Sequence, residues 1–172
     1  MNDFSHKTPA ISAPAAAAIS SCAFAVPLAL SISSTPSPNH PGILLWYKSL
    51  REPRFKPPDA LIPLAWGVIE AALALAGYRL LRAPRSVSRS RALALWGWNV
   101  GMIGGWNRLF FKRHNLPVST VAAAGLLATS VAFVGQAGPV DRTASRAGLP
   151  LVGWVAFATV LTATIWHLNS RK

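Results

Sequence analysis

Five long apolar stretches make up most of this chain, and they limit its fold more than any other feature. They span residues 10–33, 61–81, 92–111, 116–138 and 148–169. A helix needs about 20 apolar residues to cross the hydrocarbon core of a membrane, and each stretch meets that length. None carries the polar face that a helix of a soluble bundle needs. The sequence therefore predicts an all-α integral membrane protein, a multi-pass bundle of five transmembrane helices with residues 1–9 as a polar N-terminal tail.

The charged residues support this class of protein. Only 13% of the residues are charged against 52% hydrophobic, and the 17 Lys and Arg residues gather in short clusters between the apolar runs. Basic residues that flank apolar spans are typical of membrane loops and favour anionic lipid headgroups as partners. Nucleic-acid binding would need basic residues interleaved with aromatic ones on a groove, and this pattern is absent. The clusters divide almost equally between the two sides, so they assign neither the orientation nor the host membrane.

The connections between the later spans are short, which predicts antiparallel neighbours arranged in or near chain order. The first connection, residues 35–60, is long and contains six prolines together with several aromatic residues. Proline at this density argues against a helix, and so much aromatic surface argues against a solvated linker. We expect this loop to be non-helical and to fold back onto the bundle.

Seven tryptophans are many for 172 residues. Trp46, Trp96 and Trp166 lie near predicted span ends, where an aromatic belt at the headgroup level explains them. Three others lie further from the ends: Trp66, Trp106 and Trp154. For these three, packing in the belt or core and lining a flat aromatic pocket both remain open.

Three glycines recur at every fourth position of the third span: Gly97, Gly101 and Gly105. Such residues share one helix face and allow another backbone to approach closely. This row has two interpretations. It can pack against a helix of the same chain, or it can form the seam of a homodimer.

Glu70 lies about 13 Å along the second span at 1.5 Å per residue, close to the membrane middle. An acid at that depth is costly unless it is protonated, paired or turned toward a cavity, and Trp66 shares its helix face. The four histidines show no metal-ligand spacing, the single Cys22 has no partner thiol, and no nucleophile is paired with a base. The sequence therefore offers no metal site, no cofactor site and no hydrolytic centre.

A spaced set of aromatic and proline residues resembles the translocator protein family, also called tryptophan-rich sensory proteins or TspO/MBR. The set begins with Trp46-Tyr47 and continues through Pro57-Pro58 to Trp66. It continues with Tyr78, Trp106, Phe110-Phe111, Pro150, Trp154, Ala156-Phe157-Ala158, Leu161, Ile165-Trp166 and Asn169. The resemblance covers about residues 45–169.

This resemblance implies a five-helix bundle, often dimeric, with a pocket that opens toward the first loop and accepts porphyrins, sterols or benzodiazepine-type drugs. By position, the loop lid would comprise Trp46, Tyr47, Phe55, Pro57 and Pro58. The pocket would be lined or supported by Trp66, Trp106, Trp154, Ala158 and Leu161. Together with Glu70, placed there by its helix face, these residues predict a membrane protein that binds, senses or transports tetrapyrroles or similar flat apolar ligands. The alternative is an enzyme that degrades porphyrin in light.

The chain departs from the family pattern at four positions. Glu52 and Glu70 stand where the family usually has a lysine and a tyrosine, and Ile103 and Thr162 replace two asparagines. The departures remove amide groups from two helices and add acids elsewhere, so they predict a changed ligand preference.

Overall fold

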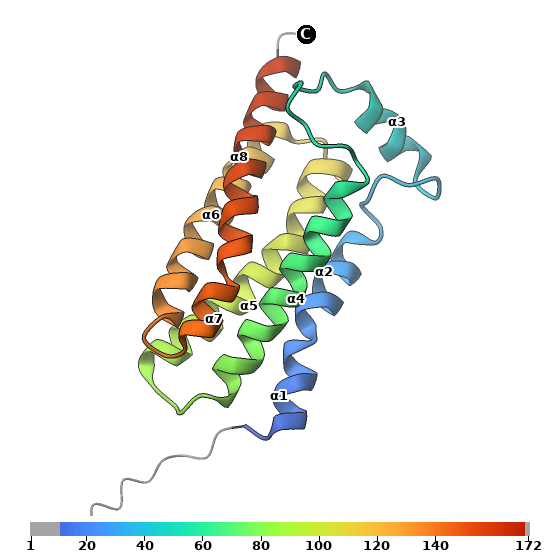
Figure 1. Ribbon diagram of the computed structural model, residues 1–172. Coiled ribbons are helices and arrows are strands. Elements are labelled where there is room, and N and C mark those ends of the chain that lie inside the picture. Colours follow the sequence, from blue (N-terminus) through green and yellow to red (C-terminus); the bar gives the residue numbers. More distant parts are fainter. Residues whose placement is uncertain (1–10, 171–172) are drawn as a thin grey trace, which may run out of the picture.

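The computed structural model describes residues 11–170, and within them every regular element is helical (Figure 1). The elements in chain order are α1 (Ala13–Ser20), α2 (Cys22–Ser31), α3 (Pro41–Ser49), α4 (Leu61–Arg82), α5 (Val87–Asn107), the π-helix η1 (Arg108–Lys112), α6 (Leu116–Ala137), α7 (Arg142–Ala147) and α8 (Leu149–Asn169). The predicted tail, residues 1–9, and the first residue of the predicted first span lie outside the described residues.

The predicted membrane fold is confirmed. Four helical segments are long and apolar enough to cross a bilayer: Ala13–Ser31, Leu61–Arg82, Leu116–Ala137 and Arg142–Asn169. The fifth, α5, runs the length of the bundle among them although Arg89 and Arg91 in its first turns make it less apolar (Figure 1). The protein is thus a multi-pass membrane bundle of five spans.

Two predicted spans differ from the observed helices. The first is broken at Ser21 into α1 and α2, and α2 also contains Pro27. The third begins at Val87 rather than Ala92, because the Ser86 side chain caps it by accepting a hydrogen bond from the Arg89 amide. Its predicted last residues, 108–111, form the π-helix instead.

Consecutive spans pack against one another, as the short connections predict, but their order around the bundle departs from chain order. α2 packs against both α4 and α5, α5 packs against α6, and α6 packs against α8. α4 and α8 are also neighbours, which closes a ring in the order first, second, fifth, fourth and third span. Uniformly apolar helices carry no polar face, so their sequences did not indicate which sides meet.

The centre of the bundle is held by two polar contacts inside the apolar core. Trp96 is 7% exposed and donates its indole N–H to the Leu73 carbonyl at 2.8 Å, joining α5 to α4. Trp96 is therefore a core residue, and the interpretation of it as part of an aromatic belt was wrong. Asn99, fully buried, accepts a 2.6 Å hydrogen bond from the Thr129 hydroxyl and so joins α5 to α6. Both contacts give hydrogen bonds to buried polar groups, and lipid could not provide such bonds.

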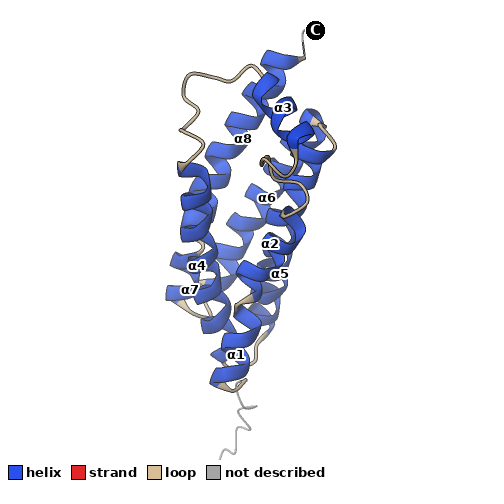
Figure 2. Cartoon of the chain, turned by 90° about the vertical axis from the view of Figure 1, so that its right-hand side faces the viewer, coloured by secondary structure: helices blue, strands red, loops and turns tan. Residues whose placement is uncertain are grey.

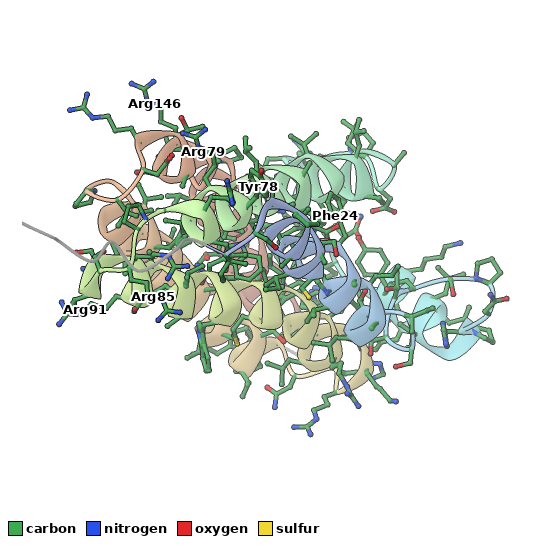
Figure 3. All side chains as sticks on the ribbon, turned by 90° about the horizontal axis from the view of Figure 1, so that it is seen from below. Phe24, Tyr78, Arg79, Arg85, Arg91 and Arg146 are labelled. Carbon is green, nitrogen blue, oxygen red and sulfur yellow. The ribbon has the colours of Figure 1, made fainter. Side chains whose placement is uncertain are left out.

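Arginines dominate the end of the bundle where α4 passes into α5 (Figure 3). Arg89 is buried and donates to the carbonyls of Leu80 and Leu81 in the last turn of α4, where carbonyls lack the usual partner four residues on. Arg79 pairs with Asp141 at 2.8 Å, tying α4 to the turn before α7. Burial works to raise the pKa of Asp141, but hydrogen bonds from Arg79 and the Ala144 amide outweigh it, and the pKa falls below its usual value.

The first connection lies at the opposite end and contains a helix, α3, which the sequence interpretation excluded (Figure 2). Pro41 occupies the first turn of α3, where a missing N–H costs nothing. The loop does fold back onto the bundle as expected. Its Arg51 amide donates to the Asn169 side chain at 3.0 Å, and the Asn169 amide group donates back to the Arg51 carbonyl at 3.1 Å.

Candidate functional site

A cavity of about 540 Å³ lies inside the bundle beneath the first loop. Its wall is formed by α2, α4, α5, α8, the π-helix and the loop itself. The lining residues from the spans and the π-helix include Trp66, Gly67, Glu70, Ile103, Trp106, Asn107, Phe110, Phe111, Trp154, Phe157, Ala158, Leu161, Thr162 and Ile165. Those from the loop include Tyr47, Lys48, Lys56, Pro57 and Asp59.

Aromatic rings form two sides of this cavity. Trp66 and Trp154 meet edge to face with ring centroids 6.1 Å apart, joining α4 to α8. Trp106 stacks on Phe110 at 4.9 Å and donates its indole N–H to the Ser119 carbonyl at 2.9 Å. Edge-to-face and offset contacts leave ring faces free, so the cavity offers flat apolar surfaces.

The face of α8 toward the cavity follows helical periodicity. Trp154, Phe157, Ala158, Leu161 and Thr162 recur at spacings of three and four and therefore lie on one face. The small side chain of Ala158 sits between larger ones and leaves room for a ligand. The Thr162 hydroxyl donates to the Ala158 carbonyl at 2.7 Å, so its hydrogen is already used within the helix.

The π-helix places two consecutive phenylalanines against the site. Phe110 and Phe111 meet edge to face at 4.8 Å, and both contact Trp106. A π-helix inserts one residue per turn relative to an α-helix and so changes which side chains face inward. Two residues after the π-helix, His114 has a φ of 51°, which lies in the left-handed region and turns the chain toward α6.

An ionic cluster, which we call the loop latch, lies on the first loop at the mouth of the cavity. It consists of Lys56, Glu52, Asp59 and Tyr47. The Lys56 ammonium lies 2.6 Å from Glu52 and 2.7 Å from Asp59, and the Tyr47 hydroxyl donates to Asp59 at 2.9 Å. Lys56 also lies 4.8 Å from the centre of the Tyr47 ring, within cation–π range.

The latch changes the ionisation of its members. The hydrogen bond from Lys56 lowers the pKa of Asp59, with a smaller contribution from Tyr47. Burial raises the pKa of Tyr47 to about 12. Burial opposes the charge on Lys56, but its bonds to Asp59, Glu52 and Tyr47 raise its pKa above the usual value. The loop therefore holds its charges across the ordinary pH range.

Glu70 is the one carboxyl group on the membrane-embedded part of the described cavity wall. It lies one helical turn from Trp66 and is half-buried. Among residues 11–170, no side chain forms an ion pair with it. The carboxyl group is therefore open to a partner that enters the cavity.

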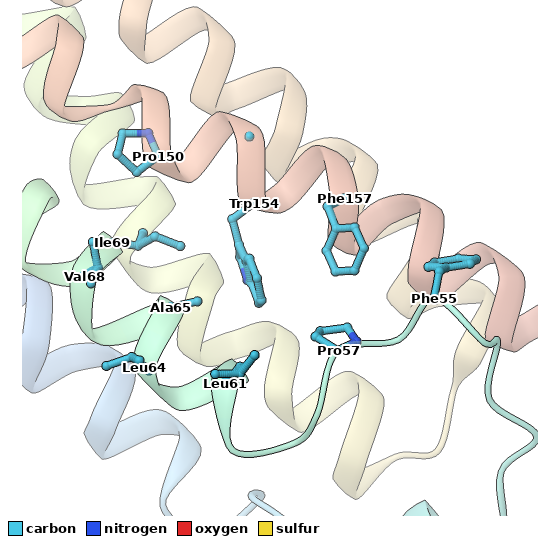
Figure 4. Close-up of a pocket in the computed structure, with 11 residues that line it drawn as sticks. Phe55, Pro57, Leu61, Leu64, Ala65, Val68, Ile69, Pro150, Trp154 and Phe157 are labelled. Carbon is cyan, nitrogen blue, oxygen red and sulfur yellow. The ribbon is translucent and has the colours of Figure 1, made fainter.

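A second depression, which we call the outer groove, opens on the outside of the bundle between α4 and α8 (Figure 4). It has a volume of about 670 Å³. It is lined by Phe55, Pro57, Leu61, Leu64, Ala65, Val68, Ile69, Pro150, Gly153, Trp154 and Phe157. Figure 4 shows Trp154 and Phe157 projecting from α8 toward Pro57.

Comparison with known proteins decides the family. Residues 23–167 match the TspO/MBR family. The chain belongs to the TspO/MBR family. It is 29% identical over 129 residues to the protein CrtK of Rhodobacter capsulatus, covering 72% of this chain and 78% of CrtK. It is also 25% identical over 132 residues to the human translocator protein, covering 73% of this chain and 76% of the relative. An uncharacterised membrane protein of Bacillus subtilis, YtaB, is 27% identical over 127 residues, covering 72% of this chain and 80% of YtaB.

The structure of this TspO/MBR protein distributes the predicted site residues over three places. Eight line the cavity: Tyr47, Pro57, Trp66, Glu70, Trp106, Trp154, Ala158 and Leu161. Phe55 lines the outer groove. Trp46 lies behind the cavity wall, stacked on His114 at 4.0 Å, and Pro58 is exposed at the loop surface.

Several lining residues were absent from the predicted set. Phe157 lies three positions after Trp154, so the periodicity of α8 was a sufficient signal for it. Lys56 was not predictable as a latch residue, because its three partners are brought together only by the fold of the loop. Ile103 and Thr162, recognised as departures from the family pattern, do face the cavity.

The glycine row of this TspO/MBR protein faces outward. A Cβ atom at Gly97, Gly101 or Gly105 would meet nothing within 4 Å. Packing of this row within one chain is therefore excluded, and Gly104 takes that role instead. A Cβ atom there would lie 2.6 Å from Cβ of Leu30, so the absence of a side chain lets α2 approach α5.

Residues 11–170 bring together no group of three or more His, Cys, Asp or Glu side chains suited to a metal ion. What the site offers is an aromatic surface inside the bundle, one internal carboxyl group and a charged loop above it.

Proposed function

We propose that this protein binds a flat apolar ligand of the tetrapyrrole class in the cavity beneath the loop latch, and that it serves in sensing or transporting that ligand. The observation that carries the proposal is a cavity of about 540 Å³ walled by tryptophan and phenylalanine rings. Cavities of roughly 300–1,000 Å³ with apolar walls and few polar groups are the usual sites for small molecules.

The polar groups of the cavity are arranged in a way that suits a porphyrin. Lys48, which forms no ion pair among the described residues, lies at the mouth, where a carboxylate of a porphyrin would meet positive charge. Glu70 lies inside and can bond a donor on the ligand. A ring system with an apolar body and acidic substituents would satisfy both regions at once.

Fluorescence quenching of the purified protein by a porphyrin tests the proposal. Trp66→Leu and Trp154→Leu should each weaken binding by about 1–3 kcal/mol, by analogy with stacking of a base on an aromatic side chain. Trp98→Leu is the matched control, because Trp98 is 59% exposed and remote from the cavity wall. Wild-type affinity in both cavity variants would remove these residues from the site. Absorbance of the bound porphyrin should stay constant under light, whereas catalytic bleaching would indicate an enzyme.

We further propose that two copies associate through the outward glycine row of α5. Gly97, Gly101 and Gly105 leave a smooth face with open space above it. In lipid, small residues favour helix association because they allow close van der Waals packing.

A further inference from the structure

We propose that the ligand enters and leaves the cavity sideways, from the lipid phase, through the outer groove between α4 and α8. The side chains of Trp154 and Phe157 form the gate between the groove and the cavity. This inference rests on the proposed function, since it describes how a ligand of the same cavity reaches it.

The groove has the chemistry of a passage from lipid. Every residue that lines it is apolar apart from the indole N–H of Trp154, and none is charged. Its α4 wall includes Leu64 and Val68, which are 65% and 59% exposed on the outside of a membrane-spanning helix. The apolar ring system of the ligand loses no solvation when it moves from the bilayer into such a groove. Its acidic substituents can stay at the loop end of the groove, which Phe55 and Pro57 line.

The groove and the cavity share a wall. Pro57, Trp154 and Phe157 line both of them. Two side chains of α8 and one loop proline are thus common to both spaces. Movement of the two aromatic side chains would join the spaces without moving a helix.

The aromatic gate is held only by ring contacts. Trp154 lies 5.6 Å from Phe157 and 6.1 Å from Trp66 between ring centroids. In the part of the chain that the structure describes, Trp96 and Trp106 each donate their indole N–H to a backbone carbonyl, and no such bond is found for Trp154. Rotation of Trp154 therefore breaks no hydrogen bond.

The route from water passes the loop latch. An apolar ligand entering under the loop would have to separate the Lys56 ammonium from two carboxylates and pass a band of charged groups. The loop is also tied to α8 by the two hydrogen bonds between Arg51 and Asn169. Opening the latch breaks several polar contacts at once, whereas opening the gate exchanges aromatic contacts for contacts with lipid and ligand.

Narrowing the groove from outside tests this route. Gly153 lines the groove but not the cavity, and a Cβ atom there would meet nothing within 4 Å. Ala65 lines the groove from the α4 side and also does not line the cavity. Gly153→Leu and Ala65→Leu should therefore fold normally and obstruct the passage while leaving the bound state unchanged.

The measurement is stopped-flow tryptophan quenching by a porphyrin carried in liposomes, with the protein in liposomes of the same lipid. A narrower passage raises the free-energy barrier to ligand entry and exit but does not change the bound state. Association and dissociation rates should therefore both fall, about tenfold for each variant, and the dissociation constant should stay unchanged. Gly125→Leu is the matched control, because Gly125 also faces open space on a membrane helix and lies outside both spaces. Its rates should equal those of the wild type.

The opposing route predicts a different result. If the ligand passes under the loop, Lys56→Met should speed both rates, and Gly153→Leu and Ala65→Leu should leave them unchanged. That outcome would overturn the lateral route while the equilibrium binding, and with it the proposed function, stands. An absence of saturable porphyrin binding in the wild type would overturn both.

Discussion

At the scale of single residues, Trp96 packs closely against Gly77 in the core. A Cβ atom at position 77 would lie 2.7 Å from two carbons of the Trp96 ring. The ring cannot move aside without losing its hydrogen bond to the Leu73 carbonyl. Gly77 is therefore required where the indole crosses α4.

Gly77→Ala should lower the free energy of unfolding by about 1–3 kcal/mol, the usual cost of overpacking a core. Thermal unfolding in mild detergent, followed by circular dichroism, measures the effect. Gly125→Ala, with open space around its Cβ position, serves as the control for helix propensity and should unfold at a slightly higher temperature than the wild type. Equal unfolding temperatures for Gly77→Ala and the control would show that the indole can shift.

Glu70 provides a second prediction at this scale. It lies on the cavity wall beside Trp66, where its carboxyl group can bond a ligand. Glu70→Gln keeps the shape and a hydrogen-bonding group, so porphyrin affinity should change little. Glu70→Leu removes the group and should weaken binding by about 0.5–1.5 kcal/mol, the net value of one hydrogen bond. Equal affinities for the two variants in a quenching titration would eliminate this role.

At the scale of elements, the loop latch explains how a proline-rich segment becomes a fixed cover. Its strength depends on charge, so it should respond to pH. Asp59 has a lowered pKa, so its contribution to stability is complete above the ordinary value of 3.8 and is lost as the pH falls below it. Tyr47 has a pKa raised to about 12, so its contribution is complete below 10 and is lost as the pH rises through 12.

The latch should therefore hold from about pH 4 to pH 10, and Lys56→Met should open it within that window. Hydrogen exchange of residues 50–60 measures this, with faster exchange expected in the variant at pH 7. The ion pairs are partly exposed, so each contributes only about 0.2–1 kcal/mol. Lys112→Met, which changes a basic residue outside the latch, is the control. Identical exchange in Lys56→Met and the wild type would show that the latch does not hold the loop.

The elements also show where sequence reasoning succeeds and where it stops. Hydropathy placed α4, α6 and α8 to within two residues, because each is a continuous apolar run between loop residues. It missed α3, since proline density hid a nine-residue helix that uses proline as its first residue. It also missed the π-helix, because one inserted residue leaves no mark in an apolar sequence.

At the scale of the whole molecule, the order of helices around the ring was the main feature that the sequence did not predict. Apolar side chains cover every face of these helices, so helical periodicity was informative only where aromatic and small residues alternate, as on α8. The same limit applied to the glycine row of α5. Its spacing was evident, but only the fold showed that the row faces outward while Gly104 packs against α2.

The outward-facing glycine row of α5 leads to the last prediction, which is a homodimer that one substitution can separate. Gly101 lies in the middle of the row, and a leucine there would project from the smooth face without meeting any atom of its own chain. Gly101→Leu should therefore leave the helicity unchanged while turning the dimer into a monomer, because two backbones could no longer approach closely. Size-exclusion chromatography with light scattering in mild detergent, repeated in nanodiscs, measures the change.

Two further variants make this test specific to the row. Gly104→Leu would collide with Leu30 of the same chain and should lower stability whatever the oligomeric state. Gly125→Leu adds the same side chain to an open face of α6 and should remain dimeric. A wild-type protein that is monomeric in both detergent and nanodiscs would contradict dimerisation through the glycine row. So would a dimer that survives Gly101→Leu, because a leucine at the centre of the contact must separate backbones whose attraction depends on close packing.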